Sequence, residues 1–259
     1  MEFSQLTYEI EGPVALIGLN RPTKRNAISD TMITELQLAV ARAGSEARVG
    51  ILFGHGDHFS AGLDLAEHVE RTPVQGIAHS QTWHRVFDAI ERGPIPYIAA
   101  LHGGVIGGGL ELAASAHIRV ADSTAFFALP EGQRGIFVGG GGSVRIARLM
   151  SATRMTDMML TGRTLSAETA ERLNLVHYLT DAGKTMDEAR RLAKQIASNA
   201  ELSNYAITNA LSRIQDLSHD DGLFFESLMA AFTQTSPDAT LRLKAFLEKR
   251  AGRVVPPPA

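Results

Sequence analysis

Short apolar runs alternate with segments of helical periodicity along the first two-thirds of the chain. Leu6–Ile10 and Val14–Leu19 are apolar runs separated by a Gly-Pro turn, which predicts a β-hairpin. Further on, apolar residues recur at helical spacing after Ser29 or Asp30, either of which can serve as the N-cap. The next apolar run, Val49–Phe53, predicts a buried strand. A strand, a helix and a strand in this order indicate a parallel βαβ unit.

The same alternation continues and then gives way to helices. Gln75–Glu91 has helical spacing, and Tyr97–Leu101 and Ile118–Ala121 read as strands. Beyond Gly142 the pattern is helical, apart from one extended segment at Val176–Leu179. The helices predicted there are Ser143–Met150, Thr153–Thr161, Ala167–Leu173, Asp187–Ser198, Asn204–Asp216, Leu223–Thr235 and Asp238–Arg250. Taken alone, this order of elements favours a doubly wound α/β core followed by a helical C-terminal third.

The composition narrows the range of functions. A chain of 259 residues is long enough for one large or two small domains. The net charge of −3 provides no strongly basic surface, which argues against nucleic acid or an anionic membrane as the main partner. The absence of cysteine excludes disulfides, thiolate catalysis and Cys-ligated metals. Because no apolar run approaches membrane-spanning length and the N-terminus lacks the pattern of a signal peptide, we expect a cytoplasmic protein.

Two glycine clusters carry the main candidate chemistry. Gly107–Gly109 and Gly139–Gly142 each precede a segment of helical pattern. Glycine lets a ligand come close to main-chain N–H groups, and a helix N-terminus adds unpaired N–H donors and a partial positive charge. The two clusters therefore predict a site for an anionic oxygen, present either in the ground state or only transiently.

A glutamate accompanies each cluster. Glu111 lies three residues after Gly108 among apolar neighbours, which predicts a buried carboxylate that must be paired or used. The alternative for Glu111 is a first-turn acid that only complements the helix dipole. Glu131 follows Pro130 in another apolar run, and its alternative is a solvated loop acid. Neither residue decides the function by itself.

Other catalytic motifs are absent from the sequence. The Gly139–Gly142 cluster lacks the Gly-Lys-Ser/Thr ending of a P-loop, and neither glycine cluster fits the dinucleotide-binding pattern. No serine stands in a G-x-S-x-G elbow. His55 and His58 are close together, but no further ligands complete a zinc site. We therefore predict no metal and interpret these histidines as polar residues of a loop.

Several blocks of sequence together resemble the enoyl-CoA hydratase/isomerase (crotonase) family, and most closely its 2-enoyl-CoA hydratases. The blocks extend nearly from end to end, and their spacing is more specific than any one of them. They are Asn20-Arg21-Pro22, Asn26-Ala27, Phe59–Leu65, Gly107–Ala113, Pro130-Glu131, Gly139–Ser143 and Phe246–Arg250. The resemblance implies an α/β fold, the ClpP-like crotonase spiral of ββα units, over residues 1–195. It also implies a helical region at 196–259 that assembles trimers, often paired into hexamers.

The resemblance also implies roles for individual residues. The N–H groups of Ala61 and Gly108 match the two oxyanion-hole donors that bind the thioester carbonyl. Glu111 and Glu131 match the two glutamates that hold the water added across the α,β double bond. The segment expected to lie along coenzyme A consists of Ala61, Gly62, Leu63 and Asp64. Coenzyme A is part of the acyl-CoA substrate, so no separate cofactor is expected.

Some further residues are candidates for substrate contacts. Lys24 and Arg25 are candidates for the phosphates of coenzyme A by charge alone, and Lys249 is a candidate contributed across a trimer interface. A few aromatic and polar positions at helical spacing predict core packing, with the wall of an acyl pocket as the alternative. They are Trp83, His84 and the Phe224–Phe232 stripe.

The identities of the acidic residues favour hydration among the reactions of this family. The Δ3,Δ2-enoyl-CoA isomerases usually work with the acid at the position of Glu131 alone, and hydroxycinnamoyl-CoA hydratase-lyases generally lack the acid at Glu111. Dienoyl-CoA isomerases carry an acid where this chain has Gly139. The blocks His102–Gly104, Pro130–Gly135 and Ser236–Leu243 are similar to the methylthioacryloyl-CoA hydratase branch, in which thioester cleavage follows hydration. A non-catalytic acyl-CoA-binding protein is a further alternative, but it has no chemical reason to keep both glutamates.

Overall fold

A computed structural model describes residues 3–67 and 70–250, and the chain divides into two units, Met1–Ala197 and Ser198–Ala259. The strands of the first unit are β1 (Leu6–Glu11), β2 (Val14–Leu19), β3 (Val49–Gly54), β4 (Tyr97–Leu101), β5 (Gly104–Ile106), β6 (Ile118–Asp122), β7 (Phe126–Ala128), β8 (Leu165–Ser166) and β9 (Tyr178–Thr180). Its helices are α1 (Asp30–Glu46), α2 (Pro73–Glu91), α3 (Gly108–Ser115), α4 (Gly142–Met150), α5 (Ala152–Thr161), α6 (Ala167–Arg172) and α7 (Thr185–Ala197). Short 3-10 helices occur at Pro22–Lys24, Leu65–Glu67 and Gly132–Arg134.

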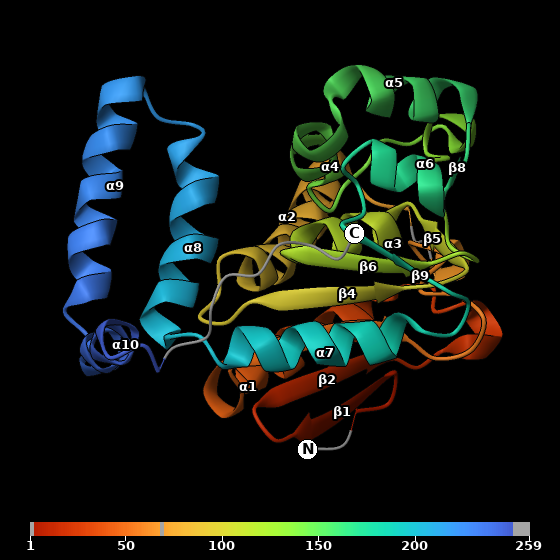
Figure 1. Ribbon diagram of the computed structural model, residues 1–259. Helices are drawn as coiled ribbons and strands as arrows, with labels where there is room; N and C mark the ends of the chain where they lie inside the picture. Colours follow the sequence, from red (N-terminus) through yellow and green to blue (C-terminus); the bar gives the residue numbers. More distant parts are fainter. Residues whose placement is uncertain (1–2, 68–69, 251–259) are drawn as a thin grey trace. The chain divides into compact units, whose positions relative to one another are not determined.

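The larger sheet has six strands in the order β1-β2-β3-β4-β6-β9 (Figure 1). β1 and β2 form the antiparallel hairpin that the sequence predicts, and the remaining neighbours are parallel. Its central strands are continuous apolar runs because helices cover both faces. Helix α7 packs on one face through Ala189, Leu192 and Ala193, whereas α1, α2 and α3 contribute to the core on the other face.

A second, smaller sheet with the order β5-β7-β8 makes the fold a spiral of ββα units. β4 of the large sheet leads to β5 of the small sheet and then to α3, and β6 likewise leads to β7. Parallel bridges from Ile28 to Leu63 and from Ser60 to Val105 extend the same layer toward the start of the chain. The doubly wound arrangement suggested by the linear pattern is therefore wrong, and the structure has the spiral of ββα units that the resemblance implies.

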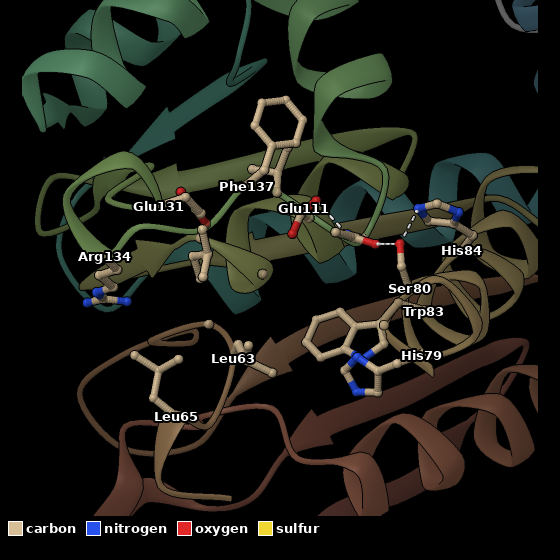
Figure 2. A pocket seen from close by; sticks show the side chains of 18 of the residues that line it. Leu63, Leu65, His79, Ser80, Trp83, His84, Glu111, Glu131, Arg134 and Phe137 are labelled. Atoms are coloured by element: carbon tan, nitrogen blue, oxygen red, sulfur yellow. Dashed lines mark hydrogen bonds between the residues drawn. The ribbon is translucent and has the colours of Figure 1, made fainter. Parts of the chain in front are cut away.

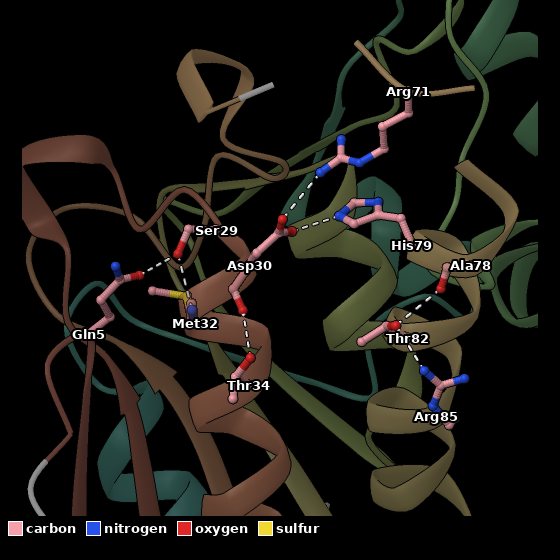
Figure 3. Close-up of polar contacts among 10 residues, drawn as sticks. All are labelled: Gln5, Ser29, Asp30, Met32, Thr34, Arg71, Ala78, His79, Thr82 and Arg85. Atoms are coloured by element: carbon pink, nitrogen blue, oxygen red, sulfur yellow. Dashed lines mark hydrogen bonds and ion pairs between the residues drawn. The ribbon is translucent and has the colours of Figure 1, made fainter. Parts of the chain in front are cut away.

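Side chains cap the N-termini of two helices. Ser29, not Asp30, is the N-cap of α1: its Oγ accepts the Met32 N–H at 3.0 Å and donates to Gln5 Oε1 at 2.6 Å (Figure 3). Thr72 forms a capping box with Gln75, so α2 begins at Pro73, two residues before the predicted start. Both caps satisfy N–H groups that the first turn of a helix leaves unpaired.

The second unit contains α8 (Glu201–Ile214), α9 (His219–Gln234) and α10 (Pro237–Leu247). Ser236 caps α10 and proline follows at its first position, as predicted. In the described part of this unit, α9 buries only Gly222 and α10 buries no residue. No helix among residues 3–67 and 70–250 is long and apolar enough to cross a membrane.

Candidate active site

A cavity of about 630 Å³ lies in the first unit, where four segments meet. Its walls come from the 61–65 loop, α2, the N-terminus of α3 and the segment from Glu131 to Gly140. Figure 2 shows Glu111 and Glu131 on one side of the cavity and the Trp83 ring across from them. The cavity thus joins the two glycine clusters and the two glutamates that the sequence identifies.

Glu111 is held by the second glycine cluster. It stands in the first turn of α3, every residue of which is buried, and the glutamate itself is 3% exposed. Its Oε1 accepts the N–H groups of Gly140 and Gly142, each at 2.8 Å. Burial raises the pKa of Glu111, and these N–H groups and the His84 charge oppose that rise by stabilising the carboxylate. Because the carboxyl group is bound by this loop, complementing the dipole of α3 is not its only interaction.

Glu131 has a different environment on the same cavity wall. It follows β7 and is 6% exposed, so it is not a solvated loop acid. Its Oε1 lies 2.7 Å from the position that a Cβ on Gly107 would occupy. Its Oε2 is buried without a hydrogen-bond partner among the described residues. Burial, reinforced by the negative charge of Glu111, raises the pKa of Glu131 to about 6.

Two residues of the cavity wall, Gly108 and Leu63, have backbone N–H groups that could bind a ligand, but only Gly108 is a predicted donor. Gly108 begins α3, so its N–H has no partner within the helix. The Ala61 N–H donates to the Arg25 carbonyl at 2.8 Å, so it is occupied within the fold. The Leu63 N–H has no acceptor in the described part of the chain, and it lies 3.4 Å from the position of a Cβ on Gly108. The geometry therefore pairs Gly108 with Leu63 and not with Ala61.

Comparison with known proteins agrees with this fold. Residues 9–253 match the family described as enoyl-CoA hydratase/isomerase. A short-chain-enoyl-CoA hydratase of Clostridium acetobutylicum is 32% identical over 253 residues, covering 96% of this chain and 97% of that protein. The chain belongs to the enoyl-CoA hydratase/isomerase family. Two crystal structures are also similar: one from Rhodopseudomonas palustris (TM-score 0.93, 50% identity, 96% of each chain covered), and enoyl-CoA hydratase subunit I of Geobacillus kaustophilus (TM-score 0.91, 33% identity, 98% and 99% covered).

The segment that the family resemblance assigns to coenzyme A borders the cavity, with one exception. Ala61, Gly62 and Leu63 line it. Asp64 does not: it is buried and forms an ion pair with Arg21 at 2.9 Å. Burial alone would raise the pKa of Asp64, but the Arg21 guanidinium and the Ala66 N–H outweigh burial and lower it. The Asp64 side chain thus stabilises the loop that presents its neighbours to the cavity.

The three predicted basic residues are exposed and lie outside the described lining of the cavity. Lys24 ends the 3-10 helix at Pro22–Lys24, and Arg25 follows it in a left-handed conformation. The Arg25 carbonyl accepts the Ala61 N–H, so the backbone that carries Lys24 and Arg25 is bonded directly to the cavity loop. Lys249 follows α10 in the second unit, and the Phe224–Phe232 stripe is on α9 of that unit.

Helix α2 contributes two residues for which the sequence left the acyl pocket open as an alternative and one, Ser80, that sequence reasoning missed. Trp83 and His84 line the cavity, which favours the acyl-pocket alternative for these two residues. Ser80 also lines it, and its Oγ donates to the Gly139 carbonyl at 2.6 Å (Figure 2). Helical spacing could have placed Ser80 and His84 on one face of α2, since they are four residues apart. Among residues 3–67 and 70–250, no group of three His, Cys, Asp or Glu side chains could hold a metal ion.

Proposed function

We propose that the protein hydrates the α,β double bond of a 2-enoyl-CoA thioester to give a 3-hydroxyacyl-CoA. One observation carries this proposal: two buried carboxyl groups, Glu111 and Glu131, share one cavity with two backbone N–H groups for which the described residues provide no acceptor. Adding water to a conjugated thioester needs both features. The N–H groups stabilise charge on the carbonyl oxygen, and the carboxyl groups move the two protons.

The oxyanion hole is proposed to consist of the Gly108 and Leu63 N–H groups. As the oxygen of water attacks the β-carbon, the double bond shifts and the thioester carbonyl oxygen acquires the negative charge of an enolate. Donors placed where this charge develops lower the barrier without having to reorganise during the reaction. The partial positive charge of the α3 N-terminus adds to the effect at Gly108.

Glu111 is proposed to take a proton from water, and Glu131 is proposed to deliver a proton to the α-carbon. The N–H bonds to Glu111 Oε1 favour its ionised form and leave Oε2 to accept a proton from water. The raised pKa of Glu131 makes it a better proton donor near neutral pH than an ordinary glutamate. After one turnover Glu111 holds a proton and Glu131 has lost one, so exchange with solvent restores both groups.

Assembly and the coenzyme A contacts belong to the same proposal. We propose a homotrimer or a pair of trimers, built through the second unit, with Lys24, Arg25 and Lys249 as contacts for the coenzyme A phosphates. This part is supported by the family relationship and by the exposed apolar side chains of α9 and α10.

A spectrophotometric assay with crotonyl-CoA tests the reaction. We expect the absorbance of the conjugated thioester to fall and the product to be heavier by one water. Glu111→Gln and Glu131→Gln should each lower kcat by at least about a hundredfold while leaving the circular dichroism spectrum unchanged. Near-wild-type rates in both variants would overturn the two-glutamate mechanism.

The product distinguishes the remaining reactions of the family. Release of free coenzyme A would indicate hydration coupled to thioester hydrolysis. Conversion of a 3-enoyl-CoA to the 2-enoyl isomer without hydration would indicate an isomerase. Binding of crotonyl-CoA and bulkier enoyl-CoA thioesters without turnover of any of them would indicate an acyl-CoA-binding protein, and it would contradict the proposed reaction.

A further inference from the structure

Arg145 contacts the loop that holds Glu111, although it does not line the cavity. Its Nη1 donates to the Gly140 carbonyl at 3.0 Å. Its guanidinium also occupies the space beside Gly141, whose φ is +97° and where any Cβ would collide with Nη1. Glycine at 141 is therefore needed both for this backbone conformation and for the close approach of the arginine.

The remaining donors of Arg145 bind the last turns of α2. Nε donates to Glu91 Oε2 at 2.7 Å, and Nη2 forms an ion pair with Asp88. Arg145 is only 8% exposed, although the Asp88 carboxylate that it binds is half exposed. Its three donor groups bind three separate acceptors, which fixes the plane of the guanidinium. One side chain thus joins the glycine loop to a helix that forms a wall of the cavity.

The Gly139–Gly142 loop depends on such outside contacts for its shape. Four consecutive glycines have no side chains of their own to restrict the backbone. Yet the N–H groups of Gly140 and Gly142 converge on a single oxygen, Glu111 Oε1, which requires one particular loop conformation. Two side chains outside the loop stabilise this conformation: Ser80 donates to the Gly139 carbonyl, and Arg145 donates to the Gly140 carbonyl.

We propose that Arg145 is a positioning residue for the reaction: by fixing the Gly140 carbonyl, it keeps the Gly140 and Gly142 N–H groups aimed at Glu111 and thereby orients that carboxylate toward the cavity. This inference rests on the proposed role of Glu111. Arg145 acts through the loop and not by a direct contact with the carboxylate, whose charged neighbours in the cavity are His84 and Glu131. The charged and titratable groups around Arg145 itself are His84, Asp88, Glu91, Arg92 and Arg148.

Three arginine variants of the full chain test the proposal. Arg145→Gln removes the charge and the fork of donors, and Arg145→Lys keeps the charge but cannot reach the Gly140 carbonyl and both α2 acids together. The matched control is Arg42→Gln, which breaks an exposed arginine–glutamate pair on α1. Each variant is measured for kcat and KM with crotonyl-CoA across pH, and Glu111 is titrated by NMR of its ¹³C-labelled carboxyl group, assigned with Glu111→Gln.

We expect Arg145→Gln to lower kcat by roughly 10- to 100-fold with KM within about threefold of wild type. The N–H bonds to Glu111 oppose the effect of burial on its pKa, so weaker bonds raise that pKa. The acid limb of the kcat profile and the carboxyl titration should therefore both move to higher pH. Arg145→Lys should lie between Arg145→Gln and wild type, and Arg42→Gln should match wild type.

The two readouts separate this inference from the proposed reaction. An unchanged Glu111 titration in both Arg145 variants overturns the positioning role, even if kcat falls. Wild-type protein without hydratase activity overturns the proposed reaction, and the titration still decides whether Arg145 controls the Glu111 carboxylate. If Arg145→Gln does not fold, Arg145→Lys gives the same test with the charge preserved.

Discussion

Glu111 and Glu131 are both buried carboxyl groups of one cavity, but they differ in their hydrogen bonds. Glu111 receives two N–H bonds on one oxygen, whereas Glu131 Oε2 has no partner within residues 3–67 and 70–250. Hydrogen bonds to the charged form stabilise it, and burial without them stabilises the neutral form. This asymmetry is the physical basis for giving the two residues different parts in proton transfer.

Replacing Glu131 with glutamine should stabilise the protein at neutral pH. The folded protein holds the pKa of Glu131 at about 6, above its ordinary value of 4.5, so it binds more protons than the unfolded chain between these two values. The free energy of unfolding of the wild type therefore loses up to about 2 kcal/mol as pH rises through this window, and the uncharged variant does not. Urea unfolding at pH 4 to 8 measures the difference between the two proteins.

The control for this measurement is Glu226→Gln, which makes the same change at an exposed position of α9. We expect the gain of Glu131→Gln over wild type to grow between pH 4.5 and 6 and to level off above. A constant difference across the whole range would mean that the pKa of Glu131 is not raised in the folded protein.

A methyl group at position 108 should block the oxyanion hole. A Cβ on Gly108 would lie 2.8 Å from the Trp83 ring and 3.4 Å from the Leu63 nitrogen, within the space where the thioester oxygen is proposed to bind. We expect Gly108→Ala to lower kcat/KM by about a hundredfold or more. Gly222→Ala, in a helix where the added Cβ makes only ordinary contacts, is the control. Equal activity of Gly108→Ala and wild type would contradict the assignment of this N–H group.

The mistake over Ala61 shows which part of the site a sequence cannot supply. A glutamate can be identified as a candidate acid or base from its residue type, and Glu111 and Glu131 both line one cavity. A backbone N–H donor is not tied to a residue type, because every residue except proline has one. The proposed oxyanion hole uses Leu63 instead of Ala61 because the Ala61 N–H already donates to the Arg25 carbonyl.

The N-cap of α1 connects a local signal to the stability of the hairpin beside it. Ser29 is 2% exposed, and its hydroxyl both accepts the Met32 N–H and donates to Gln5, which directly precedes β1. Ser29→Ala removes both bonds, so we expect it to lower the free energy of unfolding by about 1–2 kcal/mol. Ser45→Ala, an exposed serine of the same helix, should change it by less than about 0.5 kcal/mol. Urea unfolding checks both, and equal values for them would refute the capping argument.

The long elements were predictable, and the short ones that define the fold were not. The apolar runs of β2, β3 and β4 are five or six residues long, so they produce a clear pattern. β5, β7 and β8 are two or three residues long and lie beside turns or glycine, too short for any periodicity. Because the sequence pattern does not reveal the second sheet that these strands form, it predicts one parallel sheet covered by helices, which is a doubly wound fold.

The second unit exposes far more apolar surface than its length explains. Residues 198–250 make up about a fifth of the chain but hold more than half of the large apolar side chains that the described residues expose. Phe224, Leu241, Phe246 and Leu247 are each 66–78% exposed. Exposed apolar patches of this kind mark surfaces that another protein covers. The occupant proposed here is a second copy of the same chain, as in the homotrimer proposed above.

Charge introduced on α10 should therefore break the assembly. We expect light scattering after size-exclusion chromatography to give the mass of a trimer or hexamer for the wild type. The double variant Leu241→Glu with Phe246→Glu should elute as a monomer, because two carboxylates cannot be buried in an apolar interface without partners. Leu160→Glu, at a position of α5 that is 78% exposed, is the control and should keep the wild-type mass. A wild-type monomer at micromolar concentration would contradict the assembly, and an assembled double variant would place its interface away from α10.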